Sequence, residues 1–433
     1  MVQNIIDRSK LLAFAIVLLP ILDSSHIGDT SIGFGTILLI AATIWAVIFY
    51  GRLKISLGNK KMFLYMMYFL LISLICCSII PSFSLINMAV QYTKYAIYAV
   101  SIFGAYYFCD WEWCKKLYIN VCFLESIYAI IQLFLNVTTN IRLPFVFPYT
   151  TMEYGMLGSE YNARLINIMN FEGFRAVGFF PEPSHFAEYT IFSIIFLMDQ
   201  KNKSKGSYMK LVVISAALFL SMSSIGLLAY AMIFIVYYIR NMQHTGKNKF
   251  FALAFAGVLL VIGFIYAGIE FGVFDFIQNR LSTISEKKWA VSGNTRLLRG
   301  FMVYGKSNIF VKIFGFGAGN YKNFIDHFQI STFFDLQMNK YDEYMNGASF
   351  FLLHSGLIGA LLYLSFCVNL YKDGSQMKKM LLLVNILIFF TEYFFFTPIY
   401  VMSMFFIMLS DNNAFITRRK KGKFSIASVP NNL

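Results

Sequence analysis

Charge is scarce in this chain. Only 13% of its 433 residues are Asp, Glu, Lys or Arg, whereas 58% are hydrophobic. Soluble domains average about 25% charged residues, and with half that fraction a chain has too few charges to cover a surface that faces water. A soluble domain is therefore excluded, and lipid is the expected solvent. A membrane crossing takes about 20 residues, so about twelve helices would still leave room for one or two large aqueous loops.

The sequence also lacks the cysteine spacing of a zinc or redox site. Its six cysteines lie in apolar runs or on the side expected to face the cytoplasm, and no two of them stand as Cys-x-x-Cys. Thiols in a reducing compartment rarely pair, so we expect neither disulfides nor zinc. No small-residue cleavage site follows the apolar run from Leu11 to Leu22, which indicates an uncleaved first helix.

The formal net charge of +14 does not indicate nucleic acid, because the basic residues are grouped in alternate connections. The short connections between these groups hold almost no Lys or Arg. The basic groups lie at residues 8–10, 52–61, 201–210, 240–249, 372–379 and 418–423. Basic loops stay on the cytoplasmic side of a membrane, so we expect both termini in the cytoplasm and no nucleic acid as a partner.

The apolar runs predict an all-α, polytopic integral membrane protein with about twelve transmembrane helices and two large external loops. Helices are expected at residues 5–22, 32–50, 62–80, 85–108, 117–136, 184–199, 211–222, 225–239, 250–270, 347–369, 380–394 and 398–410. The chain then divides into five N-terminal helices (1–136), a first external loop (137–183), helices six to nine (184–270), a second external loop (271–345), helices ten to twelve (346–410) and a basic cytoplasmic tail (411–433). Loops of this length are usually functional or disordered, and the apolar stretches inside both predict that they fold.

Two of the helix pairs, 211–222 with 225–239 and 380–394 with 398–410, are short for full crossings. Both flanks of each pair are basic, so each pair must enter the membrane and return. We expect tightly turned hairpins, with the turns at 221–224 and at the Thr-Pro step before residue 399. A re-entrant element buried in protein is the alternative.

The densest group of polar residues, from Gly173 to His185, stands where the first large loop enters the sixth helix. Pro183 suits the first turn of a helix, and Glu182 falls where backbone N–H groups and the helix dipole favour negative charge. His185 begins a helical face that continues to Glu188. Ionisable groups at the membrane boundary are functional candidates; a helix cap with interfacial polar residues is the alternative.

A second group lies in the second large loop. Arg296 and Arg299 are three residues apart, so on a helix they would share a face and offer two planar donor forks suited to phosphate oxygens. A solvated helix face is the alternative. The run from Gly315 to Gly319 allows a tight turn and close backbone approach. No Gly-Lys-Ser or Gly-Lys-Thr step follows it, and no strand-then-helix context supports a dinucleotide site, so we expect no nucleotide cofactor.

Three further polar residues are weaker candidates. Lys94 lies in the middle of a predicted helix, where a cation needs a partner or an aqueous cavity, and a structural ion pair explains it as well as ligand binding does. Asn346 and His354 flank the start of the tenth helix, where a packing role for the His is the alternative to a functional one. The short loop around His26 holds no Asp-x-Asp motif, so metal-dependent sugar transfer has no anchor there and we expect no metal site.

These motifs together resemble the Wzy-type O-antigen polymerases, within the wider group that includes the O-antigen ligases. The stretch from Arg175 to Ser184, Arg-Ala-Val-Gly-Phe-Phe-Pro-Glu-Pro-Ser, is similar to the Arg-x-x-Gly-x-(x)-x-Glu-Pro-Ser stretch common in these polymerases. The Thr-Arg step that ends at Arg296, and Asn346 with Gly-Leu-Ile-Gly ten residues later, resemble the signature of the whole group. Ligases typically carry a His shortly before this Asn, where the present chain has Tyr-Asp-Glu at 341–343, so the resemblance favours polymerase.

The resemblance implies a metal-independent glycosyltransferase without a cofactor, in the inner (plasma) membrane of a bacterium. It would join undecaprenyl-diphosphate-linked oligosaccharide repeat units into O-antigen or capsule-type polysaccharide on the external face. Donor and acceptor would both be polyprenyl-diphosphate-linked oligosaccharides in the lipid bilayer, and a chain-length regulator is an expected partner. Arg175, Arg296 and Arg299 would stabilise the leaving lipid diphosphate, and Glu182, or secondarily His185, would accept the proton of the acceptor hydroxyl. An O-antigen ligase and a lipid-linked oligosaccharide flippase or transporter are the alternatives.

Overall fold

The structure is a computed structural model of the 433-residue chain. It describes residues 2–26, 33–50, 60–104, 109–139, 141–151, 157–172, 175–200, 204–242, 292–336, 339–372 and 374–410. The helix expected at 250–270, the first part of the second large loop and the basic tail at 411–433 lie outside the described residues.

The regular structure of the described residues is helical, which confirms the all-α class. The helices are α1 (Val2–Leu22), α2 (Phe34–Tyr50), α3 (Lys60–Ile79), α4 (Leu85–Gly104), α5 (Trp111–Thr139), α6 (Gly158–Glu172), α7 (Pro183–Met198), α8 (Lys205–Leu220), α9 (Ser224–Met242), α12 (Ser292–Lys306), α13 (Ile309–Phe314), α14 (Tyr321–His327), the 3₁₀ turn η4 (Phe333–Leu336), α15 (Gly347–Lys372), α16 (Gln376–Thr391) and α17 (Pro398–Leu409). A described helix stands at every expected position except 250–270. The number of membrane crossings and the side on which each loop lies stay predictions.

Three of the described helices, α3, α5 and α15, are long and apolar enough to cross a membrane. Their outward faces are apolar as well: on α15, the side chains of Leu357, Leu361 and Leu364 are each more than half exposed. An exposed apolar face of this kind is typical of a surface that contacts lipid or another protein. The three helices are therefore compatible with insertion into a membrane.

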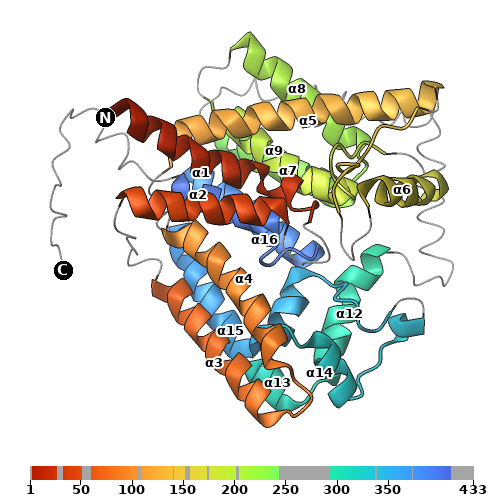
Figure 1. The fold of residues 1–433 in the computed structure, drawn as a ribbon. Coiled ribbons are helices and arrows are strands. Elements are labelled where there is room, and N and C mark those ends of the chain that lie inside the picture. Colours follow the sequence, from red (N-terminus) through yellow and green to blue (C-terminus); the bar gives the residue numbers. More distant parts are fainter. Residues whose placement is uncertain are drawn as a thin grey trace.

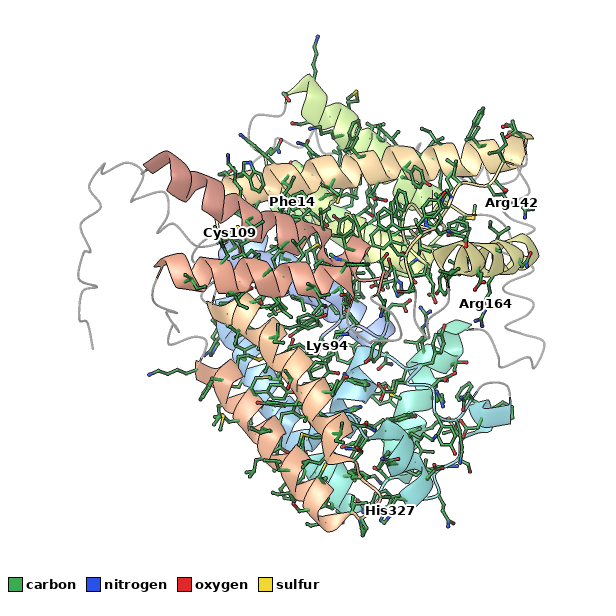
Figure 2. The ribbon with its side chains drawn as sticks, in the orientation of Figure 1. Phe14, Lys94, Cys109, Arg142, Arg164 and His327 are labelled. Carbon is green, nitrogen blue, oxygen red and sulfur yellow. The ribbon has the colours of Figure 1, made fainter. Side chains whose placement is uncertain are left out.

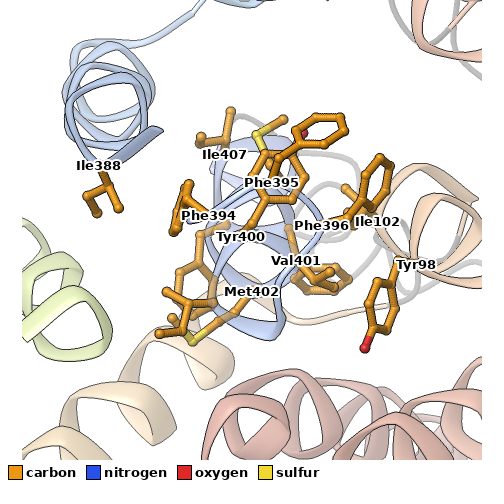
Figure 3. Packing of buried hydrophobic residues seen from close by; sticks show 14 of the residues in the cluster. Tyr98, Ile102, Ile388, Phe394, Phe395, Phe396, Tyr400, Val401, Met402 and Ile407 are labelled. Atoms are coloured by element: carbon orange, nitrogen blue, oxygen red, sulfur yellow. The ribbon is translucent and has the colours of Figure 1, made fainter. Parts of the chain in front are cut away.

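Two helices, α7 and α17, lie at the centre of the fold. The residues from Ile399 to Leu409 are all buried, and so are those from Phe186 to Leu197. A helix that is apolar on every side belongs inside a protein or a membrane. Figure 3 shows side chains of α17 and of the connection before it, together with Tyr98 of α4 and Ile388 of α16. The start of α7 and the connection between α16 and α17 carry the charged residues considered below.

Both short helix pairs are helices joined by a turn. Between α8 and α9, Met222 has a left-handed φ of 47°, and the hydroxyl of Ser221 accepts the N–H of Ser223 at 3.4 Å. Between α16 and α17, Phe396 has a φ of 55°. Thr397 caps α17, because its hydroxyl accepts the N–H of residue 400 at 3.3 Å. The serine and Thr-Pro steps thus form the turns that the sequence predicts.

The described part of the second large loop folds as short helices. Figure 1 shows α12, α13 and α14 gathered at the end of the molecule where α3 and α4 are joined. The glycine run crosses from this unit to α15: Gly315 and Gly317 have left-handed φ values of 85°, and the N–H of Gly317 donates to the carbonyl of His354 at 3.0 Å. A Cβ at Gly315 would stand 2.2 Å from that carbonyl oxygen. The run is therefore a close backbone contact with α15, beside the break in that helix at Gly356.

The described part of the first large loop is also folded. The side-chain oxygen of Asn162, on α6, accepts the N–H groups of Phe145 and Val146 at 2.8 and 3.0 Å. Figure 2 shows Arg142 and Arg164 on the same side of the molecule, below the C-terminal end of α5 in this view. The described parts of both large loops are thus folded, as the apolar stretches predict.

Candidate functional site

The residues that lead into α7 are held by a polar stripe on α5. Glu125 and Gln132 lie on one face of that helix, and both are buried. Oε2 of Glu125 accepts the N–H of Phe179 at 3.1 Å, and Nε2 of Gln132 donates to the carbonyl of Gly178 at 3.4 Å. Gly178 has a φ of 62°, and a Cβ there would stand 2.7 Å from Oε2 of Glu125. A left-handed glycine and two buried polar side chains therefore fix the path of the chain just before Glu182.

Aromatic stacking supports the same segment. The ring of Phe179 lies between those of Tyr128 and Phe147, with centroid distances of 4.4 and 5.1 Å and interplanar angles of 8° and 17°. Tyr128 is on α5 and its hydroxyl donates to the carbonyl of Pro144 at 2.8 Å. The stack joins α5 to both ends of the first large loop.

Glu182 is the residue before α7 and Pro183 is the first helical residue, as the sequence predicts. The carboxylate makes no cap hydrogen bond to its own helix. Its Oε2 instead accepts the hydroxyl of Ser184 at 3.1 Å and lies 2.5 Å from Nη2 of Arg296. The side chain is 41% exposed. The carboxylate thus contacts the second large loop and remains partly accessible to solvent.

Arg296 lies on α12 and joins three parts of the chain. While Nη2 meets Glu182 before α7, Nη1 forms an ion pair with Oε2 of Glu392, the residue after α16. The ring of Tyr344 lies against the guanidinium group, 4.6 Å from its central carbon. The arginine side chain is only 10% exposed. A guanidinium with carboxylates at both terminal nitrogens and an aromatic ring on one face is held in a single orientation.

Asn346 fixes the position of this arginine. Its N–H donates to the carbonyl of Arg296 at 2.8 Å, and its Nδ2 donates to the carbonyl of Leu297 at 3.0 Å. Its side-chain oxygen accepts the N–H of Ser349 at 2.8 Å, which caps the start of α15. The next residue donates its N–H to the carbonyl of Glu392 at 2.7 Å. Asn346 therefore ties α12, α15 and the end of α16 together around Arg296, a positioning role.

More carboxyl groups than guanidinium groups are found around Arg296. Glu188 lies on α7, one turn after His185. Its side chain is 3% exposed, and its Oε1 has no hydrogen-bond partner among the described residues. Its electrostatic neighbours are Glu392, Arg296 and Glu182. His185 interacts electrostatically with Glu182 and Arg296. The described site therefore holds three carboxyl groups, one guanidinium and one imidazole. One guanidinium cannot neutralise three carboxylates, of which Glu188 is buried and Glu392 is mostly buried.

The two ion-pair partners of Arg296 titrate differently. Burial would raise the pKa of Glu182, but the charges of His185 and Arg296 and the hydrogen bonds from Arg296 and Ser184 lower this pKa to about 2. Burial raises the pKa of Glu392 to about 7, although Arg296 pulls it down. The difference arises because His185 and the hydroxyl of Ser184 stabilise the charged form of Glu182 in addition to Arg296, whereas the charge of Glu182 raises the pKa of Glu392. Glu182 is thus ionised at neutral pH, while Glu392 is poised to exchange a proton.

Arg299 shares α12 with Arg296 but has a different set of contacts. It is fully buried, and its guanidinium donates to the backbone carbonyls of Asn339, Lys340 and Asp342. Its Nη2 also lies 3.4 Å from Oδ1 of Asp335. These contacts fix the segment just before Tyr344, the residue whose ring lies against Arg296.

The contacts described for the other candidates involve other parts of the fold. Arg175 is half-buried. The N–H of the following residue, Ala176, donates to the carbonyl of Leu220 at 3.2 Å, which places this segment at the end of α8. His354 is buried, with its Nδ1 2.6 Å from the carbonyl oxygen of Gly317, so it holds the glycine run. Lys94 lies on α4, and its ammonium is 5.9 Å from the centroid of the Tyr98 ring; Figure 2 shows it beneath α2.

Two members of the site were missed by sequence reasoning. Glu392 pairs with Arg296 across 96 residues, and Tyr344 supplies the ring. A signal for Glu392 was present, because it is the only acidic residue between 374 and 410, and an ionisable group in an apolar stretch is a functional candidate. Tyr344 carried no such signal among the 27 tyrosines of the chain.

The sequence also contains the P-loop spacing Gly-x-x-x-x-Gly-Lys-Ser, from Gly300 to Ser307. Gly300 to Lys306 are part of α12, so the backbone N–H groups there bond within a helix and do not form a phosphate cradle. Gly300 serves packing, since a Cβ at this position would stand 2.0 Å from the hydroxyl oxygen of Ser349.

Within the residues that the structure describes, no group of three or more His, Cys, Asp or Glu side chains is arranged to hold a metal ion. Comparison with known proteins found no matching family model, no matching curated protein and no matching solved structure.

Proposed function

We propose that this chain is a membrane-embedded polymerase that joins polyprenyl-diphosphate-linked oligosaccharide repeat units into an O-antigen or capsule-type polysaccharide at the external face of the bacterial plasma membrane. The observation that carries the proposal is the ion pair between Glu182 and Arg296, at 2.5 Å and 114 residues apart in sequence. These residues come from the two motifs that carry the resemblance to Wzy-type polymerases. Two motifs that meet at one accessible point support a shared chemical role.

The chemistry of this point suits a lipid diphosphate. Glycosyl transfer from such a donor leaves a diphosphate whose negative charge grows in the transition state, and a fixed guanidinium stabilises such charge. Arg296 is fixed by Tyr344 and by its backbone bond to Asn346. It lies beside the start of α7 and the end of α16, where an apolar helix bundle gives way to polar loops. A headgroup that projects from a bilayer would be found at that depth.

The residues take different roles in this proposal. Arg296 binds the diphosphate. Glu182, with His185 as the alternative, accepts the proton of the acceptor hydroxyl. Arg175 stays a candidate second phosphate ligand from the first large loop. Arg299 acts as a support, because its donors are used on backbone carbonyls.

Deletion of the gene followed by complementation tests the proposed function in the cell. Loss of a polymerase leaves surface glycan of a single repeat unit, loss of a ligase or flippase leaves none, and loss of a flippase also leaves lipid-linked repeats inside the cell. We expect single-repeat chains, restored to full length by the wild-type gene and not by Arg296→Gln. Arg164→Gln, on the exposed face of α6, is the matched control and should restore full-length chains. Absence of all surface glycan in the deletion strain would refute the polymerase.

Glu188 favours a second candidate, a transporter of lipid-linked oligosaccharide. It is a buried acid in the interior of the central helix α7, with one oxygen unpartnered in the described residues, and buried acids along a central path are typical of transporters. In liposomes that contain the purified protein, a transporter would move a lipid-linked repeat between leaflets without lengthening it. The polymerase predicts longer chains instead.

A further inference from the structure

The guanidinium of Arg296 already has a carboxylate at each of its terminal nitrogens. Glu182 lies on Nη2 and Glu392 on Nη1, and the ring of Tyr344 covers one face of the guanidinium. Arginine recognises phosphate through parallel in-plane N–H bonds from its donor fork. Each terminal nitrogen has a second N–H, but a diphosphate that joined both carboxylates would add its negative charge to a site with one guanidinium, so its binding favours the loss of at least one carboxylate.

Exposure decides which carboxylate leaves. The side chain of Glu182 is 41% exposed and that of Glu392 is 14% exposed. The backbone of Glu392 is also fixed, because its carbonyl accepts the N–H of Gly347 at 2.7 Å. A ligand that arrives from solvent or from the membrane surface therefore meets Glu182 first, and Glu182 can turn into solvent at a lower cost than Glu392.

We propose that a diphosphate which binds Arg296 displaces Glu182, and that the released carboxylate then becomes the proton acceptor of the site. This inference rests on the proposed function. In the transfer step, the acceptor hydroxyl oxygen forms a bond to the anomeric carbon of the donor. The bond from that carbon to the diphosphate oxygen breaks with its electron pair on the diphosphate, and the hydroxyl proton goes to Glu182. Donor binding thereby creates the base that the reaction needs.

The charges around Glu182 explain why release activates it. It is faced by His185 and Glu188 on α7, by Arg296 on α12 and by Glu392 after α16. In the ion pair its pKa is about 2, too low for a base at neutral pH. Once the diphosphate takes Arg296, the remaining neighbours of Glu182 are His185, two carboxyl groups and the diphosphate itself, and the like charges among them raise the pKa of a carboxylate that has lost its guanidinium partner. An acid with a pKa nearer to neutrality accepts a hydroxyl proton far more readily.

Calorimetric titration of the purified, detergent-solubilised full chain with farnesyl diphosphate tests the inference. Titrations at pH 6.5 in buffers of different ionisation enthalpy give the number of protons taken up for each ligand bound. We expect wild type to take up as much as about one proton more than Glu182→Gln. We also expect Glu182→Gln to bind up to about fivefold more tightly, since no partly exposed ion pair has to be broken. Glu160→Gln, in the exposed first turn of α6, is the matched control and should behave like wild type.

The outcomes separate this inference from the function on which it rests. Equal affinity and equal proton uptake in wild type and Glu182→Gln would overturn the displacement of Glu182 while leaving a diphosphate site in place. Failure of folded wild type to bind farnesyl diphosphate would remove the proposed function and the inference together. Infrared difference spectra of unmodified protein give a second readout that needs no variant. Addition of the ligand should produce a protonated-carboxyl band at the expense of a carboxylate band, and unchanged bands on binding would overturn the inference.

Discussion

Replacement of Arg296 by Gln should lower both stability and activity, and a second substitution should separate the two effects. The side chain of Glu392 is 14% exposed and Arg296 is its ion-pair partner, so the Gln leaves a buried carboxylate without compensation. Removal of one partner of a buried pair costs about 3–5 kcal/mol, whereas the half-exposed pair with Glu182 contributes at most about 1 kcal/mol. Because Glu392 can take up a proton near neutral pH, we expect the low end, a loss of about 3 kcal/mol in the free energy of unfolding.

The double variant Arg296→Gln with Glu392→Gln removes the stranded charge. It should recover most of the lost stability, because two neutral amides replace a broken ion pair. It should not recover activity, since no guanidinium remains to stabilise the diphosphate, and the loss of one such donor lowers the rate about 10²- to 10³-fold. Unfolding in detergent gives the stability and extension of a lipid-linked repeat gives the rate. A double variant that is stable and as active as wild type would refute the assigned role of Arg296.

Two further predictions concern stability. The pKa of Glu392 in the fold is about 7, above its ordinary value of about 4.3, so the folded state binds an extra proton between these values and stability falls as pH rises from about 4.5 to 7. Glu392→Gln should reduce this loss in the free energy of unfolding by as much as about 3 kcal/mol. Unfolding measured across that pH range checks this, and an equal pH dependence in wild type and variant would exclude the raised pKa. Gly178→Ala should destabilise by about 1–3 kcal/mol, because its φ is 62° and the added Cβ would stand 2.7 Å from Oε2 of Glu125. Unfolding of Gly178→Ala beside Gly206→Ala, where the nearest atom would be 3.8 Å away, checks this, and similar losses in both would contradict it.

The helix positions were predictable because each expected helix coincides with an apolar run bounded by polar or turn residues. The start of α7 was predictable to within one residue, because a Pro at position 183 favours the first turn of a helix. The turn before α17 was predictable for the same reason, from its Thr-Pro step. The short helices of the second large loop were not placed in advance, since their apolar residues are too few to give a clear period.

The site was predictable only in part. Glu182 and Arg296 were chosen because their motifs hold ionisable groups near a helix start and on a helix face, and the structure brings them together. Arg299 looked equivalent to Arg296 in sequence, yet it donates mainly to backbone carbonyls, with Asp335 at 3.4 Å, while Arg296 pairs with the carboxylates of Glu182 and Glu392. The pairing with Glu392 could not be predicted, because a contact between residues far apart in sequence depends on how α12 and α16 pack. Local patterns select candidates, and tertiary packing assigns their partners.

The most direct test of the central claim is chain extension by the purified protein. A defined polyprenyl-diphosphate-linked repeat unit would be supplied without nucleotide sugar, and the glycan length and the released polyprenyl diphosphate would be measured. The account predicts chains of two or more repeats from wild type, with one released lipid diphosphate for each new linkage, and no extension by the folded Arg296→Gln with Glu392→Gln variant. A wild-type protein that binds the repeat unit and leaves it unextended would contradict the account.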